Sequence, residues 1–206
     1  MTRLRQTPSQ TVGPFFAYSL TAEQYGYPYN SIVTHALVSG QTPDAYPGAE
    51  RLTITGRVFD GNGASIADAL IELWQADPAG HYRTTPIERA VDDTYFTGFG
   101  RVGTGTHRDH RFTFSTLRPG RVREGQALSA PHINVLLFMR GSLRGLYTRI
   151  YFADEAEANE QDALLARVPV ERRSTLLAQR RDTSGQVVYT FDIHMQGRHE
   201  TVFFDL

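Results

Sequence analysis

Residues 131–140, with the sequence PHINVLLFMR, constrain the fold more than any other part of this chain. Their apolar content predicts a β-strand, in which successive side chains point to opposite faces. One face would carry only apolar side chains, namely Ile133, Val135, Leu137 and Met139. The other would carry His132, Asn134, Leu136, Phe138 and Arg140. The first face is suited to a core, so the fold must include a sheet that buries it.

The second face of this strand mixes polar and apolar side chains. Burial of His132, Asn134 and Arg140 without partners would be unfavourable, so this face lines a cleft or contacts another chain. A half-solvated strand of an antiparallel sheet would give the same alternation. The strand alone leaves both interpretations open.

Size, charge and cysteine content exclude several classes of protein. A chain of 206 residues that is 40% hydrophobic can bury one core, so we expect one domain, with or without extensions. The net charge of −1 argues against nucleic acid and anionic membranes as partners. The absence of cysteine excludes disulfides, thiolate zinc sites and a cysteine nucleophile. No signal-peptide pattern or long apolar segment occurs, so we expect a cytoplasmic protein.

Residues 1–50 differ in character from the remainder. They contain five prolines and many aromatic residues without periodicity, which predicts an irregular arm that packs its rings onto another surface. Within this arm, Gly13, Pro14 and Phe15 form a stiff element that suits close contact with a ligand or a neighbouring chain. A simple turn is the alternative interpretation.

Residues 51–206 predict a mainly β domain with the turn spacing of a sandwich. Leu52, Ile54 and Gly56 alternate with polar residues, a turn follows at 60–63, and an apolar run at 69–75 suggests a hairpin or a neighbouring strand. Further strands are predicted at 112–115, 132–140, 146–152, 186–194 and 201–204.

Helices are expected only after residue 154, and on the outside of the domain. Asp154 followed by Glu157 resembles a capped helix start, and apolar residues continue the pattern to Val168. A second short helix is predicted over 171–181, where two arginines would lie at its C-terminus.

Short catalytic motifs are lacking. The chain has no serine-histidine-aspartate order, phosphate-binding loop or HExxH helix. His107 and His110 have ligand-like spacing, but they lie in the charged turn GTHRDH and are interpreted as solvated loop residues. Residue patterns alone therefore predict a β-sandwich with a polar-lined cleft.

Four segments resemble the intradiol ring-cleaving dioxygenases, in collinear order over nearly the whole chain. They are LIELWQADPAGHYR (70–83), TLRPGRV (116–122), APHINVLLFMRG (130–141) and LYTRIYFADE (146–155). The resemblance implies an intradiol-dioxygenase-like β-sandwich over residues 51–206. It also implies a non-haem Fe3+ held by two tyrosines and two histidines, and phenolate and imidazole suit such an ion.

Only two of the four expected iron ligands are present. Tyr82 matches the first tyrosine and His132 the first histidine, whereas Val122 and Asn134 stand at the other two ligand positions. Ser129 stands where active members carry an arginine. A valine has no donor and an amide replaces imidazole poorly. We therefore expect a vestigial metal site, with no metal and no catalytic residue on this chain.

The resemblance further implies that a homologous partner chain holds the iron, within a higher-order hetero-oligomer. This chain would complete the active site in which 3,4-dihydroxybenzoate and O2 give 3-carboxy-cis,cis-muconate, a step of aromatic catabolism in the beta-ketoadipate pathway. Gly13, Pro14, Phe15 and Arg140 are the expected substrate-binding residues.

Arg140 has two interpretations. Its place in the alternation would let its guanidinium project into the space vacated by the metal, where a benzoate-type carboxylate could pair with it. Alternatively it pairs with an internal acid such as Glu72 or Asp77.

Two other functions remain open at this stage. The chain could be a self-sufficient intradiol dioxygenase acting on catechol, although Val122 and Asn134 argue against that. It could also be a non-enzymatic sandwich that binds or scaffolds.

Overall fold

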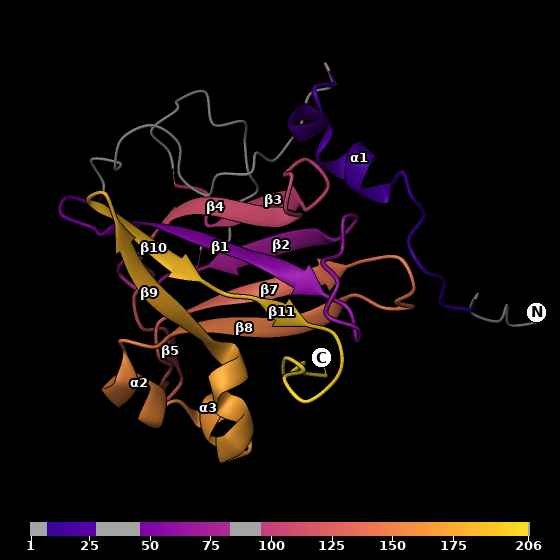
Figure 1. The fold of residues 1–206 in the computed structure, drawn as a ribbon. Helices are drawn as coiled ribbons and strands as arrows, with labels where there is room; N and C mark the ends of the chain where they lie inside the picture. The colour runs from indigo at the N-terminus through magenta and orange to yellow at the C-terminus, as the bar shows by residue number, and fades with distance from the viewer. Residues whose placement is uncertain (1–7, 28–45, 83–95, 206) are drawn as a thin grey trace, which may run out of the picture.

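The computed structural model describes residues 8–27, 46–82 and 96–205 (Figure 1). As predicted, the fold is mainly β, and its strands form a sandwich whose two layers join into one nearly closed sheet. No helix within the described ranges is long and apolar enough to cross a membrane.

The first layer contains the strand that the sequence singled out. Its order is β3 (Phe99–Gly103), β2 (Leu70–Gln75), β7 (His132–Phe138) and β8 (Leu146–Phe152). Each neighbouring pair in this layer is antiparallel. A separate hairpin, β5 (Arg123–Glu124) with β6 (Ala127–Leu128), precedes β7.

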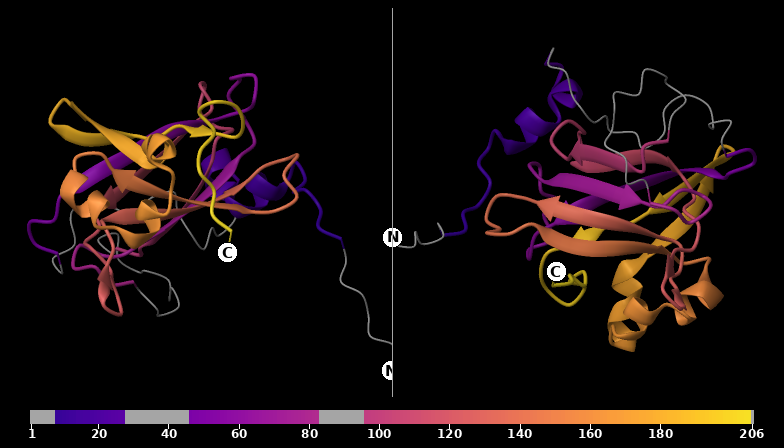
Figure 2. Two further views of the ribbon diagram at one scale, coloured as in Figure 1. Left: turned by 90° about the horizontal axis from the view of Figure 1, so that it is seen from below. Right: turned by 180° about the vertical axis from the view of Figure 1, so that it is seen from behind.

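The second layer contains β9 (Leu177–Thr183), β10 (Gln186–Thr190), β1 (Arg51–Phe59), β4 (Arg111–Leu117) and the short β11 (Ile193–His194). A brief parallel pairing of β8 with β9, at Tyr151–Leu177 and Phe152–Ala178, connects the layers. Figure 2 shows α2 and α3 gathered at one edge of the molecule and the N-terminal helix α1 near the opposite edge.

The core lies between the two layers and confirms the predicted alternation. Ile133, Val135 and Leu137 of β7 are buried in one cluster with Leu52 and Ile54 of β1. Met139 packs against this cluster and is partly buried. The apolar face of β7 is thus fully used by the core, and its other face is left for the site.

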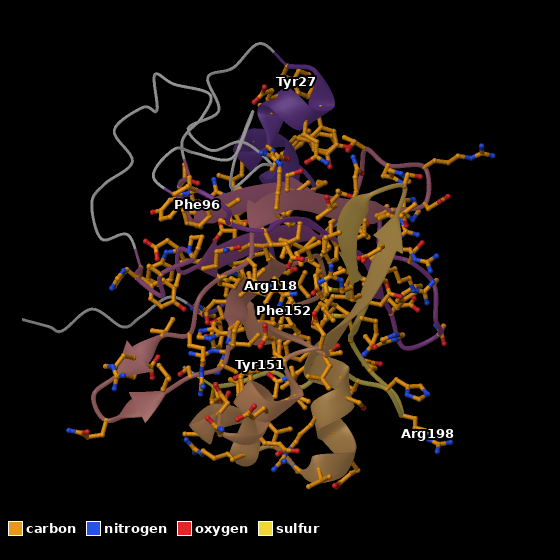
Figure 3. The ribbon with its side chains drawn as sticks, turned by 90° about the vertical axis from the view of Figure 1, so that its left-hand side faces the viewer. Tyr27, Phe96, Arg118, Tyr151, Phe152 and Arg198 are labelled. Atoms are coloured by element: carbon orange, nitrogen blue, oxygen red, sulfur yellow. The ribbon has the colours of Figure 1, made fainter. Side chains whose placement is uncertain are left out.

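An ion-pair cluster fastens the end of β4 to the segment that follows β8. Arg118 pairs with Glu50 at 2.7 Å and with Asp154 and Glu155 at 2.9 Å each. Its guanidinium lies 4.9 Å from the centre of the Phe152 ring, and Figure 3 shows the two side chains together. Because one planar guanidinium serves three carboxylates, it holds the two layers in register at this end.

The predicted pairing of the first two strands is wrong. β1 pairs with β4, β10 and β11, whereas β2 pairs with β3 and β7. Both strands carry an apolar face, and these faces meet across the core instead of side by side. After the turn at 60–63 the chain therefore crosses to the other layer.

The helical predictions are only partly confirmed. The first region divides into α2 (Ala156–Glu160) and α3 (Ala163–Ala166). The N-cap residue of α2 is Glu155, not the predicted Asp154, and its side chain makes no capping hydrogen bond, whereas Asp162 caps α3. The predicted helix over 171–181 is wrong beyond Leu176, where the 3-10 helix η2 (Val170–Leu176) gives way to β9. Pairing with β10 overrides local helix propensity there.

Strand boundaries also differ from expectation. β7 ends at Phe138, before Arg140, because a turn with Gly141 at φ +88° follows. The last predicted strand, at 201–204, is reduced to a single bridge between Phe204 and Tyr147. Strands β3 and β9 were not predicted.

The arm is not wholly irregular in its described part, residues 8–27. It forms α1 (Phe16–Leu20) and the 3-10 helix η1 (Ala22–Tyr25). Ala17 and Ala22 are buried, and the Gln24 side chain both donates to and accepts from the backbone of Gly103. The arm therefore docks on β3 of its own chain. Residues 28–45, which belong to the same prediction, lie outside the described residues.

Asp162 fixes the start of β7 to the helices. It is fully buried, and its carboxylate accepts from the backbone nitrogens of Leu164 at 3.0 Å, Leu165 at 2.8 Å and Ala130 at 2.9 Å. It also accepts from the Tyr151 hydroxyl at 3.1 Å. One carboxylate thus satisfies donors from α3, β8 and the residue that leads into β7.

We predict that Asp162→Ala lowers the free energy of unfolding by about 3 kcal/mol, because it removes a helix cap and leaves buried donors unpaired. Urea denaturation of the variant and the parent chain measures the difference. Glu160→Ala, on the exposed surface of the neighbouring helix, is the matched control and should change stability little. Equal effects of the two substitutions would contradict this role of Asp162.

Candidate functional site

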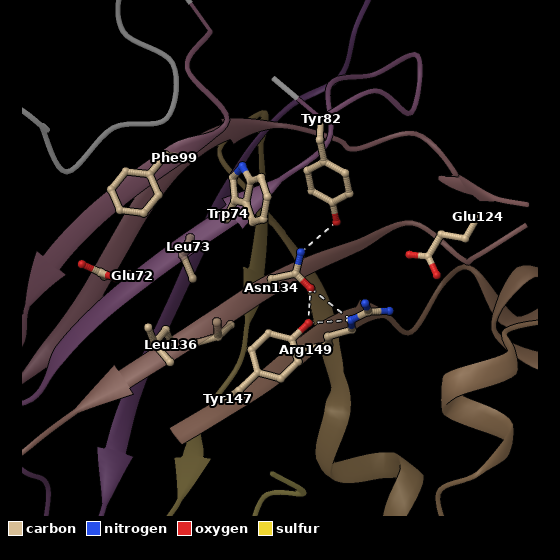
Figure 4. Close-up of a pocket in the computed structure, with 11 residues that line it drawn as sticks. Glu72, Leu73, Trp74, Tyr82, Phe99, Glu124, Asn134, Leu136, Tyr147 and Arg149 are labelled. Atoms are coloured by element: carbon tan, nitrogen blue, oxygen red, sulfur yellow. Dashed lines mark hydrogen bonds between the residues drawn. The ribbon is translucent and has the colours of Figure 1, made fainter. Parts of the chain in front are cut away.

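Three of the four vestigial metal positions meet on the outer face of β7. His132 and Asn134 project from that face. Figure 4 shows Asn134 on β7 with the Tyr82 hydroxyl, from the loop after β2, directed at it. The Tyr82 hydroxyl lies 2.9 Å from Nε2 of His132 and 2.7 Å from Nδ2 of Asn134. The side chains that the sequence placed together are therefore in direct contact.

Strand β8 adds two residues that the sequence analysis missed. The Tyr147 hydroxyl donates to Oδ1 of Asn134 at 2.5 Å, and Nε of Arg149 donates to the same oxygen at 3.0 Å. Nε of Arg149 is also 3.0 Å from the Tyr147 hydroxyl oxygen. Arg149 is opposite Asn134 in the strand register. Alternation along β8 would have placed both residues on this face, had it been applied there.

The hydrogen bonds of this network run in one direction. Nδ1 of His132 lies 2.8 Å from the Ala130 carbonyl oxygen, which can only accept, so the proton is assigned to Nδ1. Nε2 then accepts from Tyr82, Tyr82 accepts from Asn134, and Asn134 accepts from Arg149. Each member finds a partner within the protein.

Burial keeps the two retained ligand residues neutral. Burial, followed by the charge of Arg149, lowers the pKa of His132 to about 4. Burial raises the pKa of Tyr82, although the hydrogen bond from Asn134 and the charge of Arg149 act in the opposite direction. Tyr82 is therefore a phenol at neutral pH in the metal-free chain.

Val122, the fourth position, is buried, and its carbonyl oxygen accepts from the Ser129 backbone nitrogen at 2.8 Å. Its side chain offers no donor atom. Among the described residues, no group of three or more histidine, aspartate or glutamate side chains is suited to hold a metal. With one tyrosine, one imidazole, an amide and a nearby guanidinium, this donor set does not fit the iron of the resembling family.

A pocket of about 520 Å³ opens beside the network. Its lining is rich in aromatic and aliphatic side chains, with Asn134 and Arg149 at the polar end. The lining residues are Glu72, Leu73, Trp74, Tyr82, Phe99, Glu124, Asn134, Val135, Leu136, Tyr147 and Arg149. The Trp74 and Tyr82 rings lie 4.8 Å apart between centres. This confirms that the second face of β7 lines a cleft.

The prediction that Arg140 projects into the vacated metal position is wrong. Arg140 follows the end of β7, its side chain is 60% exposed, and it pairs with Asp68. Neither of the expected acids is its partner, because Glu72 pairs with Arg101 and Asp77 accepts from the backbone of its own turn. Because β7 ends at Phe138, the alternation of side chains between its two faces does not extend to Arg140.

The four predicted substrate-binding residues gather at one exposed end of the molecule. The Gly141 backbone nitrogen, next to Arg140, donates to the Thr11 hydroxyl at 2.8 Å. The Phe16 ring, which follows Gly13, Pro14 and Phe15, lies 5.4 Å from the Phe138 ring. None of the four lines the pocket beside Asn134.

Comparison with known proteins gives relatives along the full chain. A profile of the family described as "Dioxygenase" matches residues 24–197. The protocatechuate 3,4-dioxygenase alpha chain of Burkholderia cepacia is 48% identical over 100% of both chains, and that of Pseudomonas putida is 41% identical over 98% of this chain and 97% of the relative. The protocatechuate 3,4-dioxygenase beta chain of Burkholderia cepacia is 30% identical over 87% of this chain and 79% of its own length.

Solved structures agree with this likeness. The dioxygenase domain of a dioxygenase carbohydrate-binding protein fusion from Streptomyces sp. SirexAA-E is 27% identical, with a TM-score of 0.58 over 96% of this chain and 100% of that chain. Catechol 1,2-dioxygenase from Pseudomonas arvilla C-1 is 19% identical, with a TM-score of 0.54 over 79% of this chain and 57% of that chain. The second likeness concerns the fold alone.

We predict that the purified chain binds no stoichiometric iron and has no tyrosinate-to-iron absorption band, because Val122 and Asn134 cannot complete the ligand set. Metal analysis and visible absorption after incubation with iron measure this. One ferric ion per chain would contradict the prediction.

The double change Val122→Tyr and Asn134→His should still bind iron poorly, because the Arg149 guanidinium would face a trivalent ion in a partly buried site. Adding Arg149→Gln removes that charge, so the triple variant should bind more iron than the double variant. Equal iron content in the two would show that Arg149 does not oppose the metal.

A pH prediction follows from the buried, neutral His132. Its pKa is about 4 in the folded chain and about 6.5 when unfolded, so the unfolded state takes up the proton first as pH falls. Stability should therefore decrease from pH 6.5 to pH 4, by up to about 3 kcal/mol from this group. Urea denaturation across this window should show a flatter profile for His132→Gln, whereas the exposed control His199→Gln should retain the slope of the parent chain.

Proposed function

Because the chain belongs to the intradiol dioxygenase family, we propose that it is the alpha subunit of a protocatechuate 3,4-dioxygenase, without a metal of its own. In the assembly, 3,4-dihydroxybenzoate and O2 are converted to 3-carboxy-cis,cis-muconate in the cytoplasm, as part of the beta-ketoadipate pathway. A homologous beta chain carries the non-haem Fe3+ in this proposal, and the 30% identity to such a beta chain supports a pairing of related sandwiches.

The strongest support for this proposal is the residue at the position of the second histidine ligand, Asn134 on β7. Asn134 takes the place of one ligand, donates to Tyr82 and accepts from Tyr147 and Arg149. A chain with this network is not a self-sufficient intradiol dioxygenase. Its contribution to ring cleavage must therefore come from residues that it presents to a partner.

The exposed end of the arm is suited to that contribution. The Phe15 side chain is 76% exposed, and a side chain added at Gly13 would meet nothing within 4 Å. Large exposed rings mark surfaces that contact a partner. We infer that Gly13, Pro14 and Phe15 form part of the wall of the partner's substrate pocket, where glycine permits close backbone approach.

Arg140 is placed to act with this segment. Its neighbour Gly141 is hydrogen-bonded to Thr11, two residues before Gly13. Although Arg140 pairs with Asp68, its side chain remains 60% exposed. In this proposal the guanidinium supplies positive charge for the substrate carboxylate at the shared site.

We predict that Gly13→Val, in the chain assembled with its iron-bearing partner, raises KM for protocatechuate about tenfold, because the new side chain narrows the shared pocket. The melting temperature of the isolated chain should stay constant, since the position is open within the chain. Steady-state kinetics and thermal denaturation measure the two effects. Val170→Ala, at a residue that is 73% exposed, is the control and should leave KM unchanged.

Deletion of residues 1–18 removes the exposed tip together with the start of α1. It should dissociate or inactivate the complex, as measured by size-exclusion chromatography and oxygen uptake. A fully active complex with the truncated chain would favour a scaffold without a part in the active site.

A further inference from the structure

Arg149 is a charged side chain at the polar end of the pocket. Its Nε atom contacts Asn134 and Tyr147, and the guanidinium also hydrogen-bonds to the Tyr151 side chain. Among the described residues, no carboxylate forms an ion pair with its guanidinium. A guanidinium remains protonated at any physiological pH and carries two further nitrogens with a fixed planar geometry. Arg149 thus adds an uncompensated positive charge to the pocket wall.

Two acidic residues also line the pocket, but neither neutralises Arg149. Glu72 pairs with Arg101, with Oε1 and Nη2 2.5 Å apart. Glu124 lies on the β5–β6 hairpin, is solvent-exposed, and is not in ion-pair contact with Arg149 (Figure 4). An exposed carboxylate is strongly screened by water, so the partly buried charge of Arg149 dominates inside the pocket.

The remaining wall is shaped for a flat apolar group. Trp74, Tyr82, Phe99 and Tyr147 contribute rings, and Leu136 contributes an aliphatic side chain. Trp74 is 47% exposed, so the pocket opens to the surface of the chain. Buried rings favour stacked or edge-on contact with a further aromatic ring. A volume of about 520 Å³ lies within the range of small-molecule sites.

The hydrogen-bond network leaves one specific donor for a ligand. His132, Tyr82 and Asn134 satisfy one another, so they do not require an additional polar partner. The Arg149 guanidinium has five N–H groups, and its contacts with Asn134, Tyr147 and the Tyr151 side chain do not use all of them. A planar carboxylate can accept hydrogen bonds from the N–H groups that remain. A bulky tetrahedral anion would gain nothing from the aromatic wall.

We propose that this pocket is a binding site for a planar aromatic monocarboxylate, with the carboxylate on Arg149 and the ring between the aromatic side chains. The site belongs wholly to this chain and does not require the partner's iron. The inference goes beyond the proposed function, and its failure would leave the role of the arm untouched.

The chain supplies its own probe for this site. Trp74 is its single tryptophan, and it lines the pocket. Titration of the full chain with benzoate should therefore change tryptophan fluorescence, with calorimetry as an independent measure. Benzamide, which keeps the ring without the charge, and acetate, which keeps the charge without the ring, should each bind at least about tenfold more weakly.

Variants then test whether the guanidinium of Arg149 is the group that binds the carboxylate. Arg149→Gln should weaken benzoate binding at least about tenfold, whereas Arg144→Gln, at an exposed position outside the pocket, should have no effect. Near-ultraviolet circular dichroism shows whether Arg149→Gln retains the folded pocket. If the variant does not retain the folded pocket, the comparison of benzoate with benzamide on the unaltered chain still tests whether binding requires the carboxylate charge.

Three results would overturn the proposal. The first is equal affinity for benzoate and benzamide, because the charge would then have no role. The second is unchanged benzoate affinity in a folded Arg149→Gln variant. The third is the absence of both a fluorescence change and a heat signal at about 10 mM benzoate, the limit of useful affinity for so small a ligand.

Discussion

Polar groups on the outer face of β7 and β8 must find hydrogen-bond partners, and this requirement organises the site. Asn134 satisfies it, because its amide both donates to Tyr82 and accepts from Tyr147 and Arg149. An imidazole at this position could not serve all three contacts at once. The network therefore holds these side chains together through protein groups alone. It also places a positive charge where a trivalent ion would be unfavourable.

The fold tolerates this exchange because strand parity separates the two faces of β7. Ile133, Val135 and Leu137 lie in the core and are almost fully buried, whereas Asn134 and His132 point away from it. Side chains on the outer face contribute little to packing between the layers. Ligand residues can thus change on one face while the sandwich retains its structure.

The alternation of side chains along a strand predicted the fold correctly where one face is apolar and buried and the other carries polar side chains. It identified the core face of β7 and the meeting of His132 with Asn134, but it failed at Arg140, where a glycine turn ends the strand. Strand β9 was missed because its exposed charges, such as Arg180 and Arg181, resemble the surface of a helix. Arg149 was missed because the alternation was not applied to β8. The pairing of Arg140 with Asp68 depends on tertiary contacts that no local pattern contains.

The polar network and the contacts that anchor the arm lie at opposite ends of one strand. The polar network begins at His132, whereas the arm is held near Phe138 through Phe16 and just beyond it through Thr11. Six residues of extended strand separate these ends by about 20 Å. The anchoring contacts of the arm do not include any member of the network. In the proposed function, metal ligands could therefore be lost without disturbing the surface offered to a partner, so that a chain with no catalytic centre of its own could still support that of another.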